Sequence, residues 1–400
     1  MLAFMVSREG NSTPTRRNPG SQSALRQLNR ERIVQALAAG PATQAELSRT
    51  TGLSTATISN IVKELERDSM VHTAPTTSSG RRALQVRLNA DNSVAVGIDF
   101  GRRHVRVVLA TRDYRVVAEA STSLVLGHHA EHGIAMAHDL MERLLRENGL
   151  THGDVIGVGI GIPGPLDRRS HTVAHGAVLP EWVGIETEAR LREALGLPVH
   201  IDNDANLGAL AEATWGPYGG AENLVFLKIG SGIGAGLIVN GAPVYGNLGI
   251  TGEIGHSTID DRGAVCRCGS RGCLETIAST TTMIEQLSRN EPGPVTTRSI
   301  ISGAREGHPA TLRVLDDAGL AIGHALGTVA NLLNPEVIVV GGPLAELEEL
   351  LLEPIRRGIL RHTIPMVGAS TALTVSSLGE RAEALGAAAL VFRKPASAKK

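Results

Sequence analysis

Four residues in one short segment have the types and the spacing of a metal site. His256 precedes Cys266, Cys268 and Cys273, and these three are all the cysteines in the 400-residue chain. The thiols are too close together for a comfortable set of disulfides, and one would be left over. Three thiolates and an imidazole are the usual ligands of a closed, tetrahedral structural zinc site. We therefore predict a structural Zn²⁺ here, with ordinary buried thiols as the alternative.

Carboxylate and amide side chains occur beside the proposed metal ligands and after one apolar run. Glu253 and Glu275 flank the ligands, so the metal would hold both acids in place. Asn203 and Asp204 follow a run of residues with strand character. Carboxylates and amides are good partners for the ring of hydroxyl groups that a sugar presents. Simpler alternatives remain open: Asn203 and Asp204 can cap the following helix, and Glu275 can orient a metal ligand.

Apolar runs that alternate with helical patterns must position these groups. The predicted strands cover residues 94–98, 105–110, 116–121, 155–160 and 198–201, and the predicted helices cover residues 131–147 and 205–215. A second unit begins at Asn223, with strands at 224–229 and 337–340, helices at 297–306 and 309–333, and a Gly-rich turn from Gly230 to Gly236. This alternation predicts an α/β protein. We expect a final helix over residues 380–392 to pack back on the first unit, and residues 394–400 to be frayed.

The first 90 residues have a different pattern. Residues 1–20 show no apolar period and predict a disordered tail. Apolar residues recur at helical spacing over residues 24–37, and a capping box that begins at Thr43 follows them. A turn at Gly52 then precedes a third helix over residues 55–66, and residues 70–88 predict a two-stranded wing. Helix, tight turn, helix and wing together predict a winged helix-turn-helix.

The charge of this first part indicates a polyanionic partner. Its net charge is +6, whereas the rest of the chain carries −7. We expect double-stranded operator DNA to contact polar side chains of the third helix and the wing, because such groups suit base edges and phosphates. These candidate residues are Ser54, Thr55, Thr57, Asn60, Lys63, Arg81 and Arg82. The alternatives are a solvated basic tail and a helical bundle that contacts another protein.

Several motifs occur in the order found in one protein family. They are Asn203-Asp204-Ala-Asn, the turn from Gly230 to Gly236, Gly252-Glu-Ile-Gly-His256, and the cysteine cluster that ends at Glu275. From about residue 20 to residue 395 the chain resembles the ROK family of repressors, open reading frames and sugar kinases. The winged helix ahead of these motifs resembles the repressor branch, such as the xylose and N-acetylglucosamine repressors.

The resemblance implies an α/β, two-lobed, actin-like (ribonuclease H-like) sugar-kinase fold preceded by an N-terminal winged helix-turn-helix. The expected parts are a tail over residues 1–20, the winged helix-turn-helix over 21–90, a first lobe over 91–205 and a second lobe over 206–375 with the zinc site. A helix within residues 376–395 would complete the first lobe.

The resemblance also implies a sugar site between the two lobes. Its expected residues are Gly164, Asn203, Asp204, Glu253, His256 and Glu275. In the kinases of the family, the residue that matches Asp204 is the general base for the attacking sugar hydroxyl. His256 would be a zinc ligand first and would reach the sugar with its other face.

The loops that hold ATP in those kinases differ in this chain. The kinase pattern Asp-x-Gly-Gly-Thr is replaced by Asp99-Phe-Gly101-Arg102-Arg103-His104, whose long side chains crowd a hairpin that relies on close backbone approach. Ser231 replaces a usual Thr, and Pro343 replaces the third Gly of a Gly-Gly-Gly motif and so removes a backbone donor. The loop residues concerned are Asp99, Gly101, Arg102, Arg103, Gly230, Ser231, Gly232, Gly341 and Gly342. We therefore expect impaired ATP binding beside an intact sugar cleft.

Together these features predict a sugar-responsive, DNA-binding transcriptional regulator, a repressor of carbohydrate-use genes, and no catalytic residue. The alternative is an ATP-dependent, glucokinase-like sugar kinase with an added DNA-binding domain and Asp204 as its base. We expect a homodimer or homotetramer, because winged helices in a dimer read paired half-sites. No apolar run approaches the ~18 residues of a membrane span, no signal peptide is evident, and thiols kept for a metal fit a reducing compartment. A cytoplasmic protein without a membrane partner is therefore expected.

Overall fold

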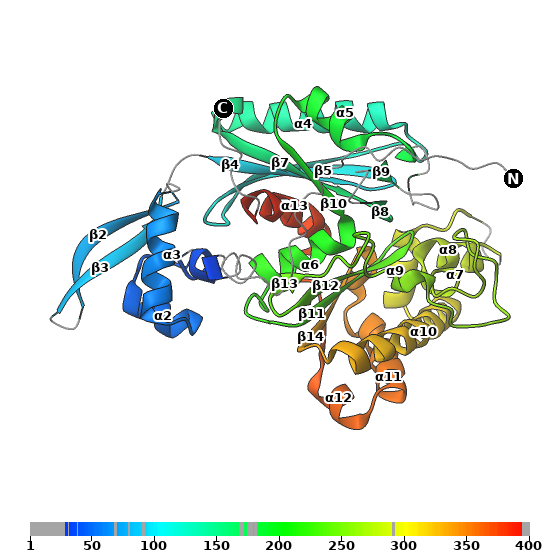
Figure 1. Cartoon of the computed structure of the whole chain (residues 1–400). Helices are drawn as coiled ribbons and strands as arrows, with labels where there is room; N and C mark the ends of the chain where they lie inside the picture. Colours follow the sequence, from blue (N-terminus) through cyan, green and yellow to red (C-terminus); the bar gives the residue numbers. More distant parts are fainter. Residues whose placement is uncertain are drawn as a thin grey trace, which may run out of the picture. The chain divides into compact units, whose positions relative to one another are not determined.

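The computed structural model describes residues 29–30, 32–37, 39–67, 70–78, 81–89, 93–167, 172–173, 179, 182–289 and 293–393. The expected tail over residues 1–20, the start of the first helix, Gly80 at the wing tip and the end of the chain from residue 394 lie outside these residues. The chain divides into two compact units, with the boundary between Asn89 and Ala90 (Figure 1).

The first unit has the predicted order of helices followed by a wing. Residues 29–30 and 32–37 are helical. The other elements are β1 (Ala42–Thr43), α2 (Gln44–Thr51), α3 (Thr55–Arg67), β2 (Val71–Ser78) and β3 (Arg81–Leu88). The strands form a sheet in the order β1-β3-β2, in which both pairings are antiparallel. This arrangement confirms the predicted winged helix-turn-helix.

Local chemistry sets the ends of the helices in this unit. The Thr43 hydroxyl accepts a hydrogen bond from the Glu46 N–H, and the Glu46 carboxylate accepts one from the Thr43 N–H at 2.7 Å. This is the predicted capping box. Gly52 ends α2 with a positive φ of 72°, a conformation that glycine adopts without strain. The buried side chains of α3 are Ile58, Ile61, Val62 and Leu65.

The first sheet of the second unit has the strand order β10-β7-β4-β5-β6. Its strands are β4 (Val94–Phe100), β5 (His104–Thr111), β6 (Val116–Ser123), β7 (Val155–Ile162) and β10 (Val199–Asn203). Helices α4 (Ala130–Glu147) and α5 (Thr187–Leu195) cover one face, and α13 (Ala382–Arg393) packs against the other (Figure 1). The short strands β8 (Leu166–Asp167) and β9 (Thr172–Val173) form a separate pair.

The second sheet has the strand order β13-β12-β11-β14-β15. Its strands are β11 (Leu224–Ile229), β12 (Ile233–Val239), β13 (Ala242–Pro243), β14 (Val337–Gly341) and β15 (Ala372–Val375). One face packs on α6 (Asp204–Trp215), and an apolar core joins the other to α10 (Pro309–Leu333) and α11 (Glu349–His362). The remaining helices are α7 (Glu275–Ala278), α8 (Thr280–Ser288), α9 (Thr297–Arg305) and α12 (Pro365–Ser370).

Helices α6 and α13 lie between the two sheets and pack on each other (Figure 1). The approach of α13 to the first sheet is close enough to require glycine. A Cβ atom on Gly97 would lie 1.9 Å from the carbonyl oxygen of Ala384, and one on Gly159 would lie 1.8 Å from that of Ala387. The predicted final helix is therefore present, and it packs on the first sheet as expected.

One predicted turn is shorter than expected. The Gly-rich turn covers only Gly230 to Gly232, where the Gly230 N–H bonds to the Gly232 carbonyl at 2.9 Å. Gly234 and Gly236 belong to β12. A Cβ atom on Gly236 would lie 2.2 Å from the carbonyl oxygen of Ala205. These later glycines therefore give α6 room to approach the strand rather than forming a turn.

None of the described helices combines the length and the apolar character needed to cross a bilayer. The lobe boundaries at residues 205 and 375 remain an interpretation, because α6 packs on the second sheet and also on α13 of the first.

Candidate ligand cleft and metal site

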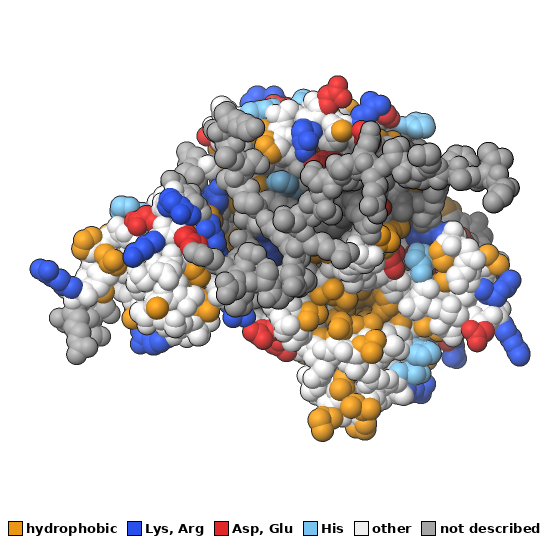
Figure 2. Space-filling model, viewed as in Figure 1, with side chains coloured by type: hydrophobic (Ala, Val, Ile, Leu, Met, Phe, Trp, Pro, Cys, Tyr) orange, Lys and Arg blue, Asp and Glu red, His pale blue; other side chains and the backbone are white. Residues whose placement is uncertain are grey.

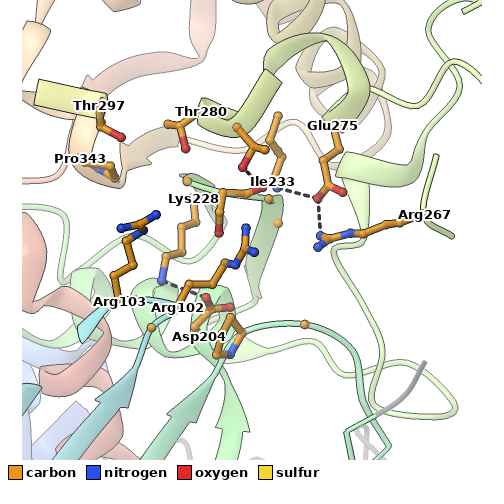
Figure 3. Close-up of a pocket in the computed structure, with 18 of the residues that line it drawn as sticks. Arg102, Arg103, Asp204, Lys228, Ile233, Arg267, Glu275, Thr280, Thr297 and Pro343 are labelled. Atoms are coloured by element: carbon orange, nitrogen blue, oxygen red, sulfur yellow. Dashed lines mark hydrogen bonds and ion pairs between the residues drawn. The ribbon is translucent and has the colours of Figure 1, made fainter. Parts of the chain in front are cut away.

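A cavity of about 530 Å³ opens in the second unit (Figure 3). All of the predicted sugar-binding residues line it, namely Gly164, Asn203, Asp204, Glu253, His256 and Glu275. Several loop residues line it as well, namely Gly101, Arg102, Arg103, Gly230, Ser231, Gly232 and Pro343. The fold therefore gathers side chains from widely separated segments around one space of the size that small-molecule ligands occupy.

Asn203 stands at the junction between β10 and α6. Its side-chain oxygen accepts hydrogen bonds from the N–H groups of Ala205 and Asn206. Its side-chain nitrogen donates to the Gly164 carbonyl at 2.9 Å. Asn203 is thus the helix cap that the simpler alternative predicted, and it also ties the loop after β7 to the start of α6.

Asp204 is paired with a buried lysine that the sequence analysis missed. The Lys228 ammonium lies 2.8 Å from Oδ2 of Asp204 and 2.9 Å from Oε1 of Glu383 in α13. Burial alone would lower the pKa of Lys228, but the charges of Asp204 and Glu383 raise it well above its ordinary value. The other oxygen of Asp204 accepts from the Ala205 N–H at 2.9 Å. Both oxygens of the carboxylate that would act as a kinase base are therefore engaged.

A second pair occupies the hairpin between β4 and β5. The His104 Nε2 lies 2.9 Å from Oδ2 of Asp99. Burial alone would raise the pKa of Asp99, but the charge of Lys228 and the hydrogen bond of His104 hold it below its ordinary value. A Cβ atom on Gly101 would lie 2.2 Å from the His104 ring. The imidazole therefore covers the hairpin backbone at the position where the sequence predicted crowding.

One of the two acids that flank the predicted metal ligands is held by a different cation. Arg267 donates to Oε2 of Glu275 at 2.7 Å, and the Ile233 N–H donates to the same oxygen at 3.2 Å (Figure 3). Burial, and then the negative charges of Asp204 and Glu275, raise the pKa of Glu253 to about 7. Near neutral pH, Glu253 can therefore both donate and accept hydrogen bonds in the cavity.

The four predicted metal ligands come together at the edge of this cavity. Their ligand atoms all lie within 4.8 Å of one another. The His256 Nδ1 is 3.6 Å from Sγ of Cys266, and Sγ of Cys268 is 3.7 Å from Sγ of Cys273. A tetrahedral zinc with Zn–S bonds of about 2.3 Å separates two sulfur ligands by roughly 3.8 Å. The donor set and its spacing therefore fit Zn²⁺, which would cross-link the segment without taking part in chemistry.

His256 presents its two ring nitrogens to different neighbours. Nδ1 faces the cysteines, whereas Nε2 lies 3.8 Å from Oε2 of Glu253. The ring thus stands between the metal cluster and the cavity, as expected for a ligand whose other face meets the bound molecule. All three cysteines are free thiols.

The predicted DNA-contacting residues of the first unit cluster on α3 and the wing. Thr55, Asn60 and Lys63 are exposed on α3. The Ser54 side chain accepts from the Thr57 N–H, and the two hydroxyls lie 2.8 Å apart, so this pair serves the helix start as well. Arg82 is exposed on β3, while the side chain of Arg81 lies outside the described residues. Figure 2 shows Lys and Arg side chains on the visible face of this unit.

Comparison with known families accounts for both units. Residues 95–394 match the ROK family, and residues 32–82 match the MarR family. The chain belongs to the ROK family.

Known ROK relatives include both regulators and kinases. A xylose repressor from Caldicellulosiruptor bescii is 28% identical over 389 residues, which cover 93% of this chain and 97% of the relative. A glucokinase from Halalkalibacterium halodurans is 33% identical over 277 residues, which cover 66% of this chain and 84% of the relative. A crystal structure of a ROK transcriptional regulator, a homologue of the E. coli MLC protein, has a TM-score of 0.74 at 26% identity, covering 92% of this chain and 97% of that one.

Some loop residues of this ROK protein do not reach the cavity. Asp99, Gly341 and Gly342 are absent from its lining, whereas Pro343 is part of it. Gly342 has a φ of 94°, and a Cβ atom there would lie 2.1 Å from the Ile229 carbonyl oxygen. Its role is therefore to let the chain pass closely over β11.

Three residues that shape the ROK cleft were missed from the sequence, although two left a signal. Lys228 is the one charged residue in the apolar run Leu224–Ile229. Glu383 is the one charged residue between Ala382 and Phe392 in an Ala-rich helix. A lone charge in an apolar run indicates a buried partner. Arg267 stands between two of the predicted metal ligands, Cys266 and Cys268, and nothing in the sequence alone points its side chain toward the cavity.

Proposed function

We propose that this protein is a sugar-responsive transcriptional repressor, whose first unit binds operator DNA and whose cleft binds a sugar or sugar derivative. The observation that carries the proposal is the joining of two parts in one chain. A winged helix with exposed Thr55, Asn60 and Lys63 is followed by a cavity of about 530 Å³. That cavity is lined by carboxylates and an amide, which are suitable partners for sugar hydroxyls.

The cleft also favours sensing over phosphoryl transfer. In the proposed regulator, Asp204 stays bound to Lys228 and so acts as a fixed hydrogen-bond acceptor rather than a proton acceptor. Phosphoryl transfer depends on positioning ATP phosphates against the backbone, and the His104 ring covers the hairpin at Gly101. A structural Zn²⁺ would hold His256 and the segment around Glu275 in place for recognition.

The proposed mechanism is a shift between two conformations. Sugar binding favours a closed arrangement of the two sheets, and closure changes the spacing of two winged helices in a homodimer or homotetramer. Because a dimer reads half-sites about one helical turn apart, a small rotation between subunits is enough to uncouple them. A ligand can shift such an equilibrium only by its difference in affinity for the two states.

A mobility-shift assay with DNA from upstream of the protein's own gene tests this proposal. The full-length protein should form a complex that weakens with salt and that a panel of sugars and sugar phosphates dissociates or strengthens. Strengthening would assign an activating or co-repressing mode. A protein that forms no salt-sensitive complex with this DNA or with other carbohydrate-gene promoters would contradict the proposal.

An ATP-dependent sugar kinase with an added DNA-binding domain is the second candidate, because Asp204, which matches the kinase base by resemblance, lines the cavity. Purified protein would be incubated with Mg-ATP and a panel of hexoses and pentoses, and ADP release would be measured. Turnover that disappears in Asp204→Asn would establish the kinase and overturn the proposal of a pure regulator. We expect no sugar-dependent ADP release.

A further inference from the structure

Two arginines in the cavity differ from its other cations in the contacts they make with described residues. Lys228 and Arg267 are bound to carboxylates, as described above. Arg102 and Arg103 also line the cavity, and Figure 3 shows both guanidinium groups extending into it from the β4–β5 hairpin. Within the described part of the chain, neither guanidinium makes a hydrogen bond or an ion pair. Two unpaired guanidinium groups in one cavity are ready to bind an anion bidentately.

The surroundings of the two arginines favour negative charge as well. Ser231, Thr280 and Thr297 line the same cavity. Thr280 is the first residue of α8, and Thr297 is the first residue of α9, so two helices begin at the cavity wall. Two acids near the hairpin, Asp99 and Asp204, are already paired with His104 and Lys228. Two further acids, Glu253 and Glu285, also line the cavity, so the attraction of an anion depends on the two arginines.

We propose that the effector is a sugar that carries an anionic group, a phosphate ester or a carboxylate, and that Arg102 and Arg103 bind this group. The sugar ring would occupy the part of the cavity lined by Asn203, Glu253 and His256. This inference rests on the proposed function and specifies the class of effector. It also gives the two arginines a function. They would not need one if the hairpin were only an ATP-binding loop that no longer binds ATP.

The inference is tested by calorimetric titration of full-length protein with matched pairs of ligands. Each pair contains a neutral sugar and its phosphate: glucose and glucose 6-phosphate, N-acetylglucosamine and its 6-phosphate, xylose and xylose 5-phosphate. Glucuronate tests whether the site binds a sugar that carries a carboxylate. Mg-ATP tests whether the site binds the phosphates of a nucleotide instead. For at least one pair, the anionic member should bind about tenfold or more tightly than the neutral member, because charge-assisted hydrogen bonds are roughly twice as strong as neutral ones.

Variants of the β4–β5 hairpin test whether Arg102 and Arg103 cause this difference in affinity between the anionic and the neutral ligand. The double variant Arg102→Ala/Arg103→Ala should bind the anionic member no more tightly than the neutral one and should keep its affinity for the neutral sugar. Arg102→Lys/Arg103→Lys should retain part of the advantage, since charge remains and the planar fork is lost. The matched control is Arg143→Ala/Arg146→Ala, which removes two exposed arginines from α4 and should bind like the parent protein.

Three outcomes would overturn the inference. Neutral sugars that bind as tightly as every anionic partner would refute the anion site while leaving a sugar-responsive regulator intact. Arg-dependent binding of Mg-ATP, without Arg-dependent binding of any sugar phosphate or glucuronate, would assign the arginines to a nucleotide. A protein that binds operator DNA but none of these sugars in either form would remove the sugar-sensing function and this inference together.

Discussion

Lys228 sets the electrostatics at the floor of the cleft. It lies between Asp204 and Glu383, and its side chain is 19% exposed while theirs are 10% and 6% exposed. Removing one partner of a buried ion pair leaves an uncompensated charge, and this costs more than the pair itself contributes. The three residues come from β11, α6 and α13, so the same contacts also join the two sheets.

The order of destabilisation among variants of this cluster follows from its geometry. Lys228→Met leaves two acids without a partner, and we expect a loss of about 3 kcal/mol in the free energy of unfolding. Asp204→Asn leaves Lys228 paired with Glu383, so its cost should be smaller. Urea denaturation of the second unit, followed by far-UV circular dichroism, measures both. If Asp204→Asn lowered the free energy of unfolding as much as Lys228→Met or more, Lys228 would not be the shared partner of both acids.

The pair of His104 and Asp99 predicts a defined pH dependence. Burial lowers the pKa of His104, but the hydrogen bond and charge of Asp99 outweigh this and raise it above its ordinary value of 6.5. Protonated His104 therefore stabilises the fold below pH 6.5, and this contribution is lost as pH rises through the raised pKa. Asp99 has a lowered pKa, so its contribution is present above its ordinary value of 3.8 and is lost only at lower pH.

An NMR titration of the His104 ring measures this directly. The midpoint should lie above pH 6.5 in the parent protein and should fall in Asp99→Asn, where the burial remains and the negative charge is gone. Lys228 and Glu383 act on His104 with opposite signs and weaker effect, so Lys228→Met should move the midpoint further upward. An unchanged midpoint in Asp99→Asn would show that the contact is absent in solution.

At the scale of elements, the loop from Cys266 to Cys273 connects the proposed metal site to the cleft. Arg267 lies between two ligand cysteines and holds Glu275 at 2.7 Å, and Glu275 in turn accepts from the first residue of β12. A metal that fixes the cysteines therefore also fixes two cavity side chains. The role of such a metal would be positioning, because the proposed ligands other than His256 do not line the cavity.

Metal analysis by plasma mass spectrometry should find about one zinc per chain. Cys268→Ser should lose the metal and weaken binding of the effector about tenfold or more, as expected for a site whose supporting metal is removed. Ser270→Ala changes an exposed residue of the same loop and should keep both. A metal-free protein that binds the effector normally would show that the cysteines are ordinary thiols.

Helix α3 predicts separate effects on specificity and affinity. Lys63→Ala should weaken binding to all DNA sequences and reduce the salt dependence of log K by about one phosphate contact. Asn60→Ala should weaken binding to the operator by about 1–3 kcal/mol and spare non-specific DNA. Arg143→Ala in α4 is the charge-matched control. Mobility shifts over a range of salt concentrations separate these effects, and equal losses on operator and random DNA for Asn60→Ala would exclude base contact.

At the scale of the whole molecule, patterns local in sequence were predictable, whereas most contacts between distant segments were expected only from the family resemblance. The capping box at Thr43, the strand alternation from Ser93 and the clustering of His256 with the cysteines all depend on residues near one another in sequence. The return of the final helix to the first unit was expected, but the pairing of Lys228 with Glu383 was not, because spacing alone does not specify which side chains meet. The Gly234 and Gly236 positions were assigned to a turn because a close helix approach and a turn both select glycine.

The return of α13 predicts a strong effect of a small substitution. Gly159→Ala places a Cβ atom 1.8 Å from the Ala387 carbonyl oxygen, so strand and helix must separate. We expect destabilisation of the second unit by about 3 kcal/mol, with operator binding by the first unit retained. Gly220→Ala is the control, since a Cβ atom there meets nothing within 4 Å. Thermal unfolding measures both variants, and a neutral Gly159→Ala would contradict the packing of α13 on β7.

Because α13 spans Ala382–Arg393, it leaves the ribosome after every other described helix and strand. The winged helix is synthesised before both sheets and can fold while they are still being made. The first sheet lacks one of its helical layers until α13 has emerged. We therefore expect a message truncated shortly before residue 382 to yield an intact winged helix that no longer responds to the proposed effector.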